Sequence, residues 1–302
     1  MREALFSKNV FFMRFNIYKF LFQRSNNYNW IVFFRISFGF FILLHFISIL
    51  PDFSDLFSKQ GIIPSDILDV YVPNFVLTLP KIIDKLEFFG FIESNIIIIF
   101  KLCYILLSVF IIVGLYPRIT AFLLLFLQIS LIKGGSFYAY GVDFFTSMSL
   151  FYLLLIPSHY KMSVHTFFRH QIKEINITPY RRLFQIHLTV LYFFSGFDKL
   201  LGFNWRNGES IWKAINLPSV NQDFNFDFEF LADYPIALVA IGWVTIIIEM
   251  CYPIFIWYPK TQFYWLILIV SMHLGIALVL NLYFFSALMI IWNITNFYYN
   301  KK

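Results

Sequence analysis

Long runs of apolar residues constrain this chain more than any other feature of its sequence. Several of them reach the roughly 20 apolar residues that an α-helix needs to cross a bilayer. Of the 302 residues, 60% are hydrophobic and only 13% are charged, whereas a soluble domain carries about 25% charged residues. Inside a bilayer a helix satisfies its own backbone hydrogen bonds. The sequence therefore predicts an all-α polytopic integral membrane protein.

The runs predict eight membrane-spanning helices. The third, fourth and eighth runs are short or have indistinct boundaries, so a total of seven or nine spans is also compatible with the sequence. The stretch 263–299 is too long for a single crossing, so we divide it near Asn281 into two spans. We expect one transmembrane domain over residues 29–300, without an extramembrane domain, and a non-helical loop over residues 51–73. The first six predicted spans are residues 30–50, 96–116, 119–132, 137–156, 183–201 and 234–258.

The distribution of charge predicts how the chain lies in the membrane. The net charge is +6, and the basic residues gather in short loops and at the N-terminus. This placement follows the positive-inside rule, so the expected partner is the lipid bilayer and not nucleic acid. We expect a multi-pass protein of a bacterial inner membrane with both termini in the cytoplasm. Residues 1–28 fit either a basic amphipathic helix on the cytoplasmic surface or a solvated tail that only sets topology.

A few ionisable residues fall inside the apolar runs or at their edges, where they are costly and are functional candidates by default. Glu249 lies near the middle of the sixth predicted span and needs a partner, for which Lys199, His273 and Arg35 are candidates. A structural ion pair that locks the bundle is an equal alternative. His273 fits a hydrogen-bonding interior residue as well as a functional one. If Asp143 lies at the membrane interface, the free-energy cost of its carboxyl group is small. Arg35 lies one turn into its span, where we expect it to snorkel.

The stretch 188–212 carries the most concentrated polar pattern. Tyr192, Ser195 and Lys199 fall on one face of a helix, so a phenol, a hydroxyl and an amine could line one cavity. Gly196 lets a neighbouring helix approach closely, and Trp205 follows in a polar turn. Lys199 is either a snorkelling anchor or an amine held as a base. No metal-ligand spacing, phosphate-binding glycine loop or nucleophile elbow is present, so no metal is predicted.

This stretch, YFFSGFDKLLGFNWRNGESI, resembles the core motif of the vitamin K-dependent gamma-carboxylase and its bacterial relatives, the horizontally transferred transmembrane (HTTM) domain proteins. Its matching residues are Gly196, Lys199, Trp205 and Gly208. Further family-like motifs follow the right order: GLYPR, YAYGVDFF, HYKMSVH and MHLGIALVLNLYFF. The resemblance covers nearly the whole chain from about residue 30.

The resemblance implies that Lys199 is the base that drives oxygenation of a reduced quinone of the vitamin K type. It also implies that His159 and His273 are counterparts of the family's functional histidines. The predicted topology places His159 near the inner side and Lys199 near the outer side, which disagrees with a shared site. The gamma-carboxylase also has a large C-terminal extramembrane region that this sequence lacks after its last predicted helix.

Shorter proteins of this kind include the membrane subunit of the sporulation-delaying peptide system, which implies a secreted peptide substrate and a small partner subunit. We therefore expect a gamma-carboxylase-like membrane protein that modifies or helps mature a peptide or quinol-type substrate. Lys199, His273 and His159 are the candidate catalytic residues. The expected pocket is formed by Tyr192, Ser195, Trp205, Glu249 and Asp143. The alternatives are a non-catalytic scaffold or immunity-type partner of a secreted peptide, and a DoxX-like quinone-associated redox protein.

Overall fold

The computed structural model describes residues 17–25, 27–73, 75–158, 162–164, 166, 175–217, 223–224 and 226–300. Within these ranges every regular element is a helix and none is a strand. Five helices are long and apolar enough to cross a membrane. They are α2 (Asn29–Ser48), α6 (Glu93–Val113), α7 (Pro117–Gly134), α13 (Pro235–Phe255) and α14 (Gln262–Leu280). The predicted all-α membrane fold is confirmed.

Three further helices complete the predicted set of spans. α8 (Gly141–Leu155) and α15 (Tyr283–Phe297) are apolar but shorter. α10 (Thr178–Leu201) has 24 residues, which corresponds to a length of about 36 Å. That length exceeds the hydrocarbon core of about 30 Å. Each of the eight predicted spans thus coincides with a helix.

The predicted break near Asn281 is confirmed. α14 ends at Leu280, and Asn281 adopts a left-handed backbone conformation with φ of +54° before α15 begins at Tyr283. Asparagine tolerates this conformation better than most residues. One residue therefore divides the long apolar stretch into two helices.

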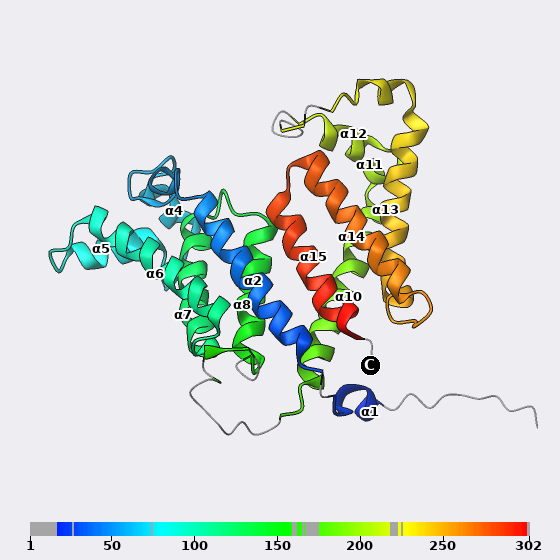
Figure 1. The fold of residues 1–302 in the computed structure, drawn as a ribbon. Coiled ribbons are helices and arrows are strands. Elements are labelled where there is room, and N and C mark those ends of the chain that lie inside the picture. Colours follow the sequence, from blue (N-terminus) through cyan, green and yellow to red (C-terminus); the bar gives the residue numbers. More distant parts are fainter. Residues whose placement is uncertain are drawn as a thin grey trace, which may run out of the picture.

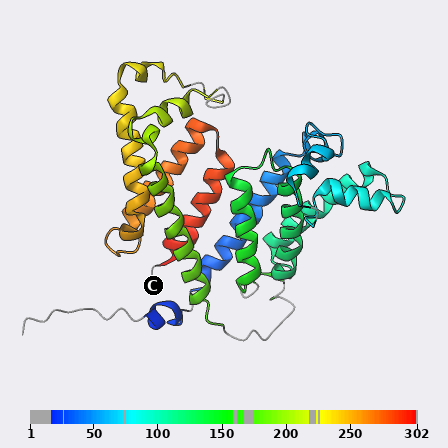
Figure 2. The same cartoon turned by 180° about the vertical axis from the view of Figure 1, so that it is seen from behind.

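The helices form two groups that α15 joins. α2, α6, α7 and α8 lie on one side of α15, and α10, α13 and α14 lie on the other (Figure 1). The view from behind shows the same division (Figure 2). The short helix α1 (Ile17–Phe22) and the last turn of α15 lie at the same end of the bundle (Figure 1). This matches an even number of crossings, and the assignment of that end to the cytoplasm stays a prediction.

The opposite end carries short helices, and here the prediction of a non-helical loop over residues 51–73 is wrong. α3 (Phe53–Phe57) and α4 (Ser65–Tyr71) both fall in that range. Phe53 and Phe57 lie one turn apart in α3, and both are buried. Burial of this apolar face against the bundle stabilises the helix. α5 (Leu79–Glu87), α11 (Phe203–Arg206) and α12 (Glu209–Ile215) lie at this end too (Figure 1).

Arg35 also departs from expectation, because it does not snorkel. Its side chain is fully buried. Its guanidinium donates from Nη1 to the carbonyl oxygens of Ile111 at 3.0 Å and Ile112 at 2.6 Å, and from Nη2 to that of Met162. The last carbonyls of a helix lack intrahelical partners and carry partial negative charge. Arg35 therefore caps the C-terminal end of α6.

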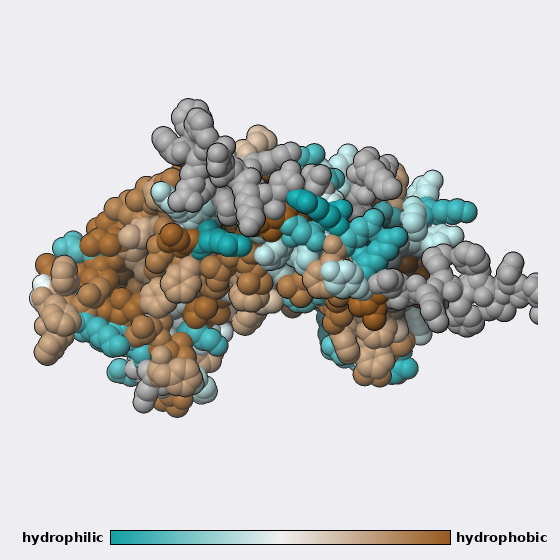
Figure 3. All heavy atoms as spheres, turned by 90° about the horizontal axis from the view of Figure 1, so that it is seen from below, coloured by the Kyte–Doolittle hydropathy of each residue, from teal (hydrophilic) through white to brown (hydrophobic). Residues whose placement is uncertain are grey.

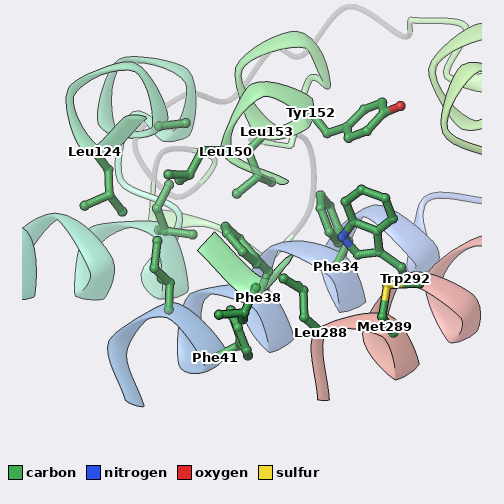
Figure 4. Close-up of a cluster of buried hydrophobic side chains, with 14 of the residues drawn as sticks. Phe34, Phe38, Phe41, Leu124, Leu150, Tyr152, Leu153, Leu288, Met289 and Trp292 are labelled. Atoms are coloured by element: carbon green, nitrogen blue, oxygen red, sulfur yellow. The ribbon is translucent and has the colours of Figure 1, made fainter. Parts of the chain in front are cut away.

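The buried core lies where α2, α8 and α15 meet. Phe34, Phe38 and Phe41 of α2 face side chains of the two other helices (Figure 4). The facing residues include Leu150 and Leu153 of α8 and Leu288, Met289 and Trp292 of α15. Large apolar side chains elsewhere are exposed on the outer faces of α6, α7, α13 and α14. Seen from the end that carries α1, hydrophobic residues cover the flanks and hydrophilic ones gather between them (Figure 3).

Candidate functional site

The polar face predicted on α10 lines a cavity between α10, α13, α14 and α15. Tyr192, Ser195 and Lys199 all contribute to its wall. They recur at helical spacing, so three consecutive turns of α10 present a phenol, a hydroxyl and an amine to the same space. We call this space the Lys199 cavity.

Lys199 is held by polar contacts at the end of α10. Its Nζ lies 2.6 Å from Oε2 of Glu249 on α13 and 2.6 Å from the hydroxyl oxygen of Ser195. Its Nζ also lies 5.2 Å from the centre of the Trp205 ring, in cation–π geometry. The Lys199 side chain is 19% exposed and that of Glu249 is 8% exposed. Among the candidate partners of Glu249, the structure therefore selects Lys199.

Gly196 makes this pairing possible, as the sequence predicted. A methyl group at Gly196 would lie 2.8 Å from the backbone nitrogen of Met250 and 2.9 Å from Cβ of Glu249. No side chain larger than hydrogen fits at that separation. α10 and α13 therefore approach closely one turn before Lys199, and the amine reaches Glu249 without a long extension.

Trp205 is positioned by a second close approach. It lies on α11, and its carbonyl oxygen would clash with a methyl group at Gly242 of α13. Gly208 follows with φ of +84°, in the left-handed region that favours glycine. These two glycines fold the polar turn back over the end of α13. The indole thereby covers the Lys199 amine.

A hydrogen-bond network occupies the interior side of the cavity. The hydroxyl of Tyr192 lies 2.7 Å from Nε2 of His273 on α14. Asn293 on α15 donates from Nδ2 to the Tyr192 oxygen at 2.7 Å and to the Met289 carbonyl at 2.9 Å. Tyr252 on α13 donates to Oδ1 of Asn293 at 2.8 Å. The network thus joins all four helices around the cavity.

The network fixes where its protons lie. Because Asn293 Nδ2 also contacts a carbonyl oxygen, that atom must be the donor, and the Asn293 oxygen accepts from Tyr252. The buried Tyr192 hydroxyl receives a hydrogen bond from Asn293 and needs an acceptor for its own proton. The only acceptor placed for it among the described residues is Nε2 of His273. A neutral His273 therefore carries its proton on Nδ1.

The Lys199 cavity has a volume of about 430 Å³, which is within the usual range for ligand pockets. Its polar groups gather on one side. The rest of its wall is mainly apolar and includes Leu191, Ile241, Ile276, Val279 and Phe228. α11, α12 and the 3-10 helix η1 (Glu229–Asp233) lie near its end. Within the described ranges, no group of His, Cys, Asp and Glu side chains could hold a metal ion.

A sequence model of the HTTM domain matches residues 73–301. The chain belongs to the HTTM domain family. The family resemblance found from the sequence motifs is thereby confirmed, and the match includes every residue that lines the Lys199 cavity. No curated protein and no solved structure matches the sequence. The particular similarity to the sporulation-delaying peptide system stays a prediction.

Within this HTTM domain the predicted pocket residues fall into three groups. Lys199, His273, Tyr192, Ser195, Trp205 and Glu249 all line the Lys199 cavity. Asp143 lies elsewhere, in the first turn of α8, where its Oδ2 accepts a hydrogen bond from the Tyr140 backbone nitrogen at 3.0 Å. His159 lies outside the described residues. The catalytic roles of Lys199, His273 and His159 stay predictions.

Sequence reasoning missed Tyr252 and Asn293, which complete the network. Tyr252 is fully buried and its ring lies 4.3 Å from that of Tyr192, centre to centre. The signal for Asn293 was present, because it is a carboxamide inside the apolar helix α15 and polar side chains in such helices need partners. Only the packing of α15 against α10 and α13 shows which partners it finds.

Proposed function

We propose that this HTTM protein is a membrane enzyme related in chemistry to the gamma-carboxylase. In this account it modifies or helps mature a peptide or a quinol-type lipid-soluble substrate, with Lys199 as the base. The observation that carries the proposal is the convergence in one cavity of the Lys199 amine, the Glu249 carboxylate and the Tyr192–His273 pair. Convergent polar groups in a largely apolar pocket are the usual sign of a binding or catalytic site.

The geometry around Lys199 suits a base that works with a proton partner. Nζ accepts a substrate proton only when its third proton has moved, and Glu249 Oε2 lies within hydrogen-bond distance to receive it. Proton uptake from the substrate then restores an ammonium–carboxylate pair, while the proton on Glu249 leaves for water or for product. The Ser195 hydroxyl, 2.6 Å from Nζ, accepts a second hydrogen bond from the amine and holds its direction.

His273 would act on the substrate side by position rather than by charge. Its Nε2 is engaged by the Tyr192 hydroxyl, and the Asn293–Tyr252 pair holds that hydroxyl in place. The imidazole is therefore fixed as a neutral ring at the cavity wall. We assign it the role of orienting the substrate relative to Lys199.

The residues present fit a reduced quinone, which is the cofactor that we propose. Leu191, Ile276 and Val279 offer an apolar surface for its ring system and tail, and Trp205 offers an aromatic face. The Lys199 amine would accept a proton from a ring hydroxyl of the bound quinol. When bound, such a quinol would supply reducing electrons and an acidic hydroxyl group. The proposed peptide substrate and small partner subunit would approach from the end that carries α11 and α12.

The test is a comparison of variants in cells that produce the candidate secreted peptide. Wild type, Lys199→Arg, Lys199→Ala and His273→Ala are expressed to equal membrane levels, and mass spectrometry follows the peptide and the quinone pool. Lys101→Arg is the matched control. Lys101 is also a lysine on a spanning helix with its Nζ near an aromatic ring, that of Phe53 at 4.8 Å, but it lies outside the cavity. We expect Lys199→Arg to lose a mass change that the wild type and Lys101→Arg both produce.

A second candidate function has its own observation in support. The Lys199–Glu249 contact also fits a structural ion pair that locks α10 to α13, in a scaffold or immunity-type partner of a secreted peptide. In that case Lys199→Arg keeps the charge and the function. Identical products from all variants, with the partner peptide still bound by the wild type, would favour this second function.

A further inference from the structure

A second cavity lies in the other half of the bundle and has no part in the proposed function. α2, α6, α7, α8 and α3 contribute to its wall, together with the α7–α8 connection. We call it the Asp143 cavity. Its volume is about 150 Å³, which is the size of an engineered protein cavity that binds benzene. It therefore has room for one six-membered ring.

Several polar side chains of this cavity have unused hydrogen-bonding capacity. His45 is 8% exposed and Gln128 is 3% exposed, and both line the space. Gln128 accepts a hydrogen bond from Tyr104 through Oε1, but its Nε2 has no partner among the described residues. Neither ring nitrogen of His45 forms a hydrogen bond within the described residues, and the Tyr138 hydroxyl is buried there without a partner. A buried hydroxyl without a partner costs free energy, and the His45 and Gln128 atoms are free to bind an occupant of the cavity.

The wall of the cavity also carries a carboxyl group that forms no ion pair with a lysine or arginine of the described residues. Asp143 uses Oδ2 to accept the Tyr140 backbone N–H, and Oδ1 has no partner in the part of the chain that the structure describes. No cationic side chain of that part forms an ion pair with Asp143. The first turn of α8 offers this carboxylate some stabilisation. A carboxylate at the wall of this cavity nevertheless favours a positively charged occupant.

Aromatic rings form part of the remaining wall, beside aliphatic side chains. Phe46 and Tyr104 stack with their centres 3.9 Å apart, and Phe57 lies nearby in α3. Aromatic faces attract both another ring and a cation. The carboxylate and the rings together match a ligand that has an ammonium group next to a small ring.

We propose that the Asp143 cavity binds a small primary amine whose ammonium group contacts Asp143 and whose six-membered ring packs against Phe46 and Tyr104. An ammonium group has three N–H donors, and Asp143 Oδ1, a His45 ring nitrogen and the second lone pair of Gln128 Oε1 are available as acceptors. The source of the amine is a free metabolite or the N-terminus of a peptide, which share this chemistry. The site is separate from the Lys199 cavity, since the two have no lining residue in common.

The probe is benzylamine, with benzyl alcohol as its neutral counterpart, and binding to the purified protein in nanodiscs is measured by calorimetry. Asp143→Asn removes the charge and keeps an oxygen that can accept the Tyr140 N–H. Ala139→Leu, at a position in the α7–α8 connection, fills the cavity without touching a charge. Lys199→Arg, which keeps the charge beside Glu249, is the control for the other cavity. A peptide with a free N-terminal phenylglycine and its N-acetyl form distinguish a peptide source from a free amine.

We expect benzylamine to bind the wild type and Lys199→Arg alike, to bind Asp143→Asn at least about tenfold more weakly, and to lose binding in Ala139→Leu. Benzyl alcohol should bind at least about tenfold more weakly than benzylamine to the wild type. Equal binding of the two probes, or binding that Lys199→Arg abolishes, would overturn the proposal. So would displacement of benzylamine by sodium but not by choline at equal ionic strength, which would assign the site to a metal cation. If Asp143→Asn does not fold, unchanged binding to Ala139→Leu would still overturn it.

Discussion

Nζ of Lys199 on α10 lies 2.6 Å from Oε2 of Glu249 on α13, and the glycine one turn before the lysine brings the two helices together. The pair therefore has two consequences that can be separated by experiment. It links α10 to α13, and it places an amine next to a proton acceptor in a largely apolar cavity.

Removing one member of the pair should destabilise the protein more than removing both. Glu249→Leu leaves the Lys199 ammonium without its counter-charge, and breaking a buried pair in this way costs about 3 kcal/mol. The double variant Lys199→Met, Glu249→Leu should recover most of that loss. The free energy of unfolding, measured by denaturant titration in mixed micelles, gives the coupling. Strictly additive losses would show that the two side chains do not interact.

Asn293→Leu should disturb the site without breaking an ion pair. The change leaves the Tyr192 and Tyr252 hydroxyls each short of a partner, and an unsatisfied buried group costs about 1–3 kcal/mol. The histidine side of the cavity should lose its fixed orientation, so product formation should fall more than the amount of folded protein. Asn296→Leu is the matched control, because Asn296 is equally buried on α15 but its side chain hydrogen-bonds, within the described residues, only to the Trp292 carbonyl one turn earlier. Equal losses in both variants would contradict the assigned network.

Gly196→Ala and Gly275→Ala should have opposite effects. A methyl group at Gly196 would meet the Met250 backbone, so α10 must move from α13, at a cost of about 1–3 kcal/mol. A methyl group at Gly275 on α14 would meet no atom within 4 Å. Alanine is the better helix former there by up to about 1 kcal/mol. Thermal unfolding in the same detergent compares the two, and a stable Gly196→Ala protein would disprove the close contact.

Arg35→Met should weaken the end of α6. The variant leaves the Ile111 and Ile112 carbonyls without the guanidinium that caps them, and we expect a loss of about 2 kcal/mol. Arg35→Lys keeps one charged donor group, so its stability should lie between those of the wild type and Arg35→Met. Hydrogen exchange of the turn that follows α6 locates the effect. Protection that is unchanged in Arg35→Met would mean that the cap does not stabilise this end.

The sequence was sufficient for the spanning helices, because hydropathy and length report directly on the bilayer. Asn281 could be placed as a break for the same reason, since the stretch around it exceeds one crossing. The polar face of α10 was also accessible, because Tyr192, Ser195 and Lys199 lie on the same helix at fixed spacing. These are local properties of single segments.

What the sequence could not give depends on which helices become neighbours. Arg35 lies one turn into its own span, a position that suggests exposure at the membrane interface. Its burial is explained only by the end of α6, which packs beside it. From the sequence, Asp143 was placed in the same pocket as Lys199 because both are ionisable residues in or near apolar runs. Asp143 lies on α8, however, which belongs to the other group of helices. Asn293 becomes a partner of Tyr192 only through the packing of α15 against α10. The helices α3 and α4 were missed because their prolines and acidic residues suggested a loop.

The most direct test of the central claim is the mass spectrum of the secreted peptide and the quinone pool from cells with Lys199→Arg. The variant is compared at equal membrane levels with wild type and Lys101→Arg. We predict that Lys199→Arg stays folded and charged but abolishes the modification that the other two produce. A full yield of the same modification from Lys199→Arg would contradict the role of Lys199 as the base.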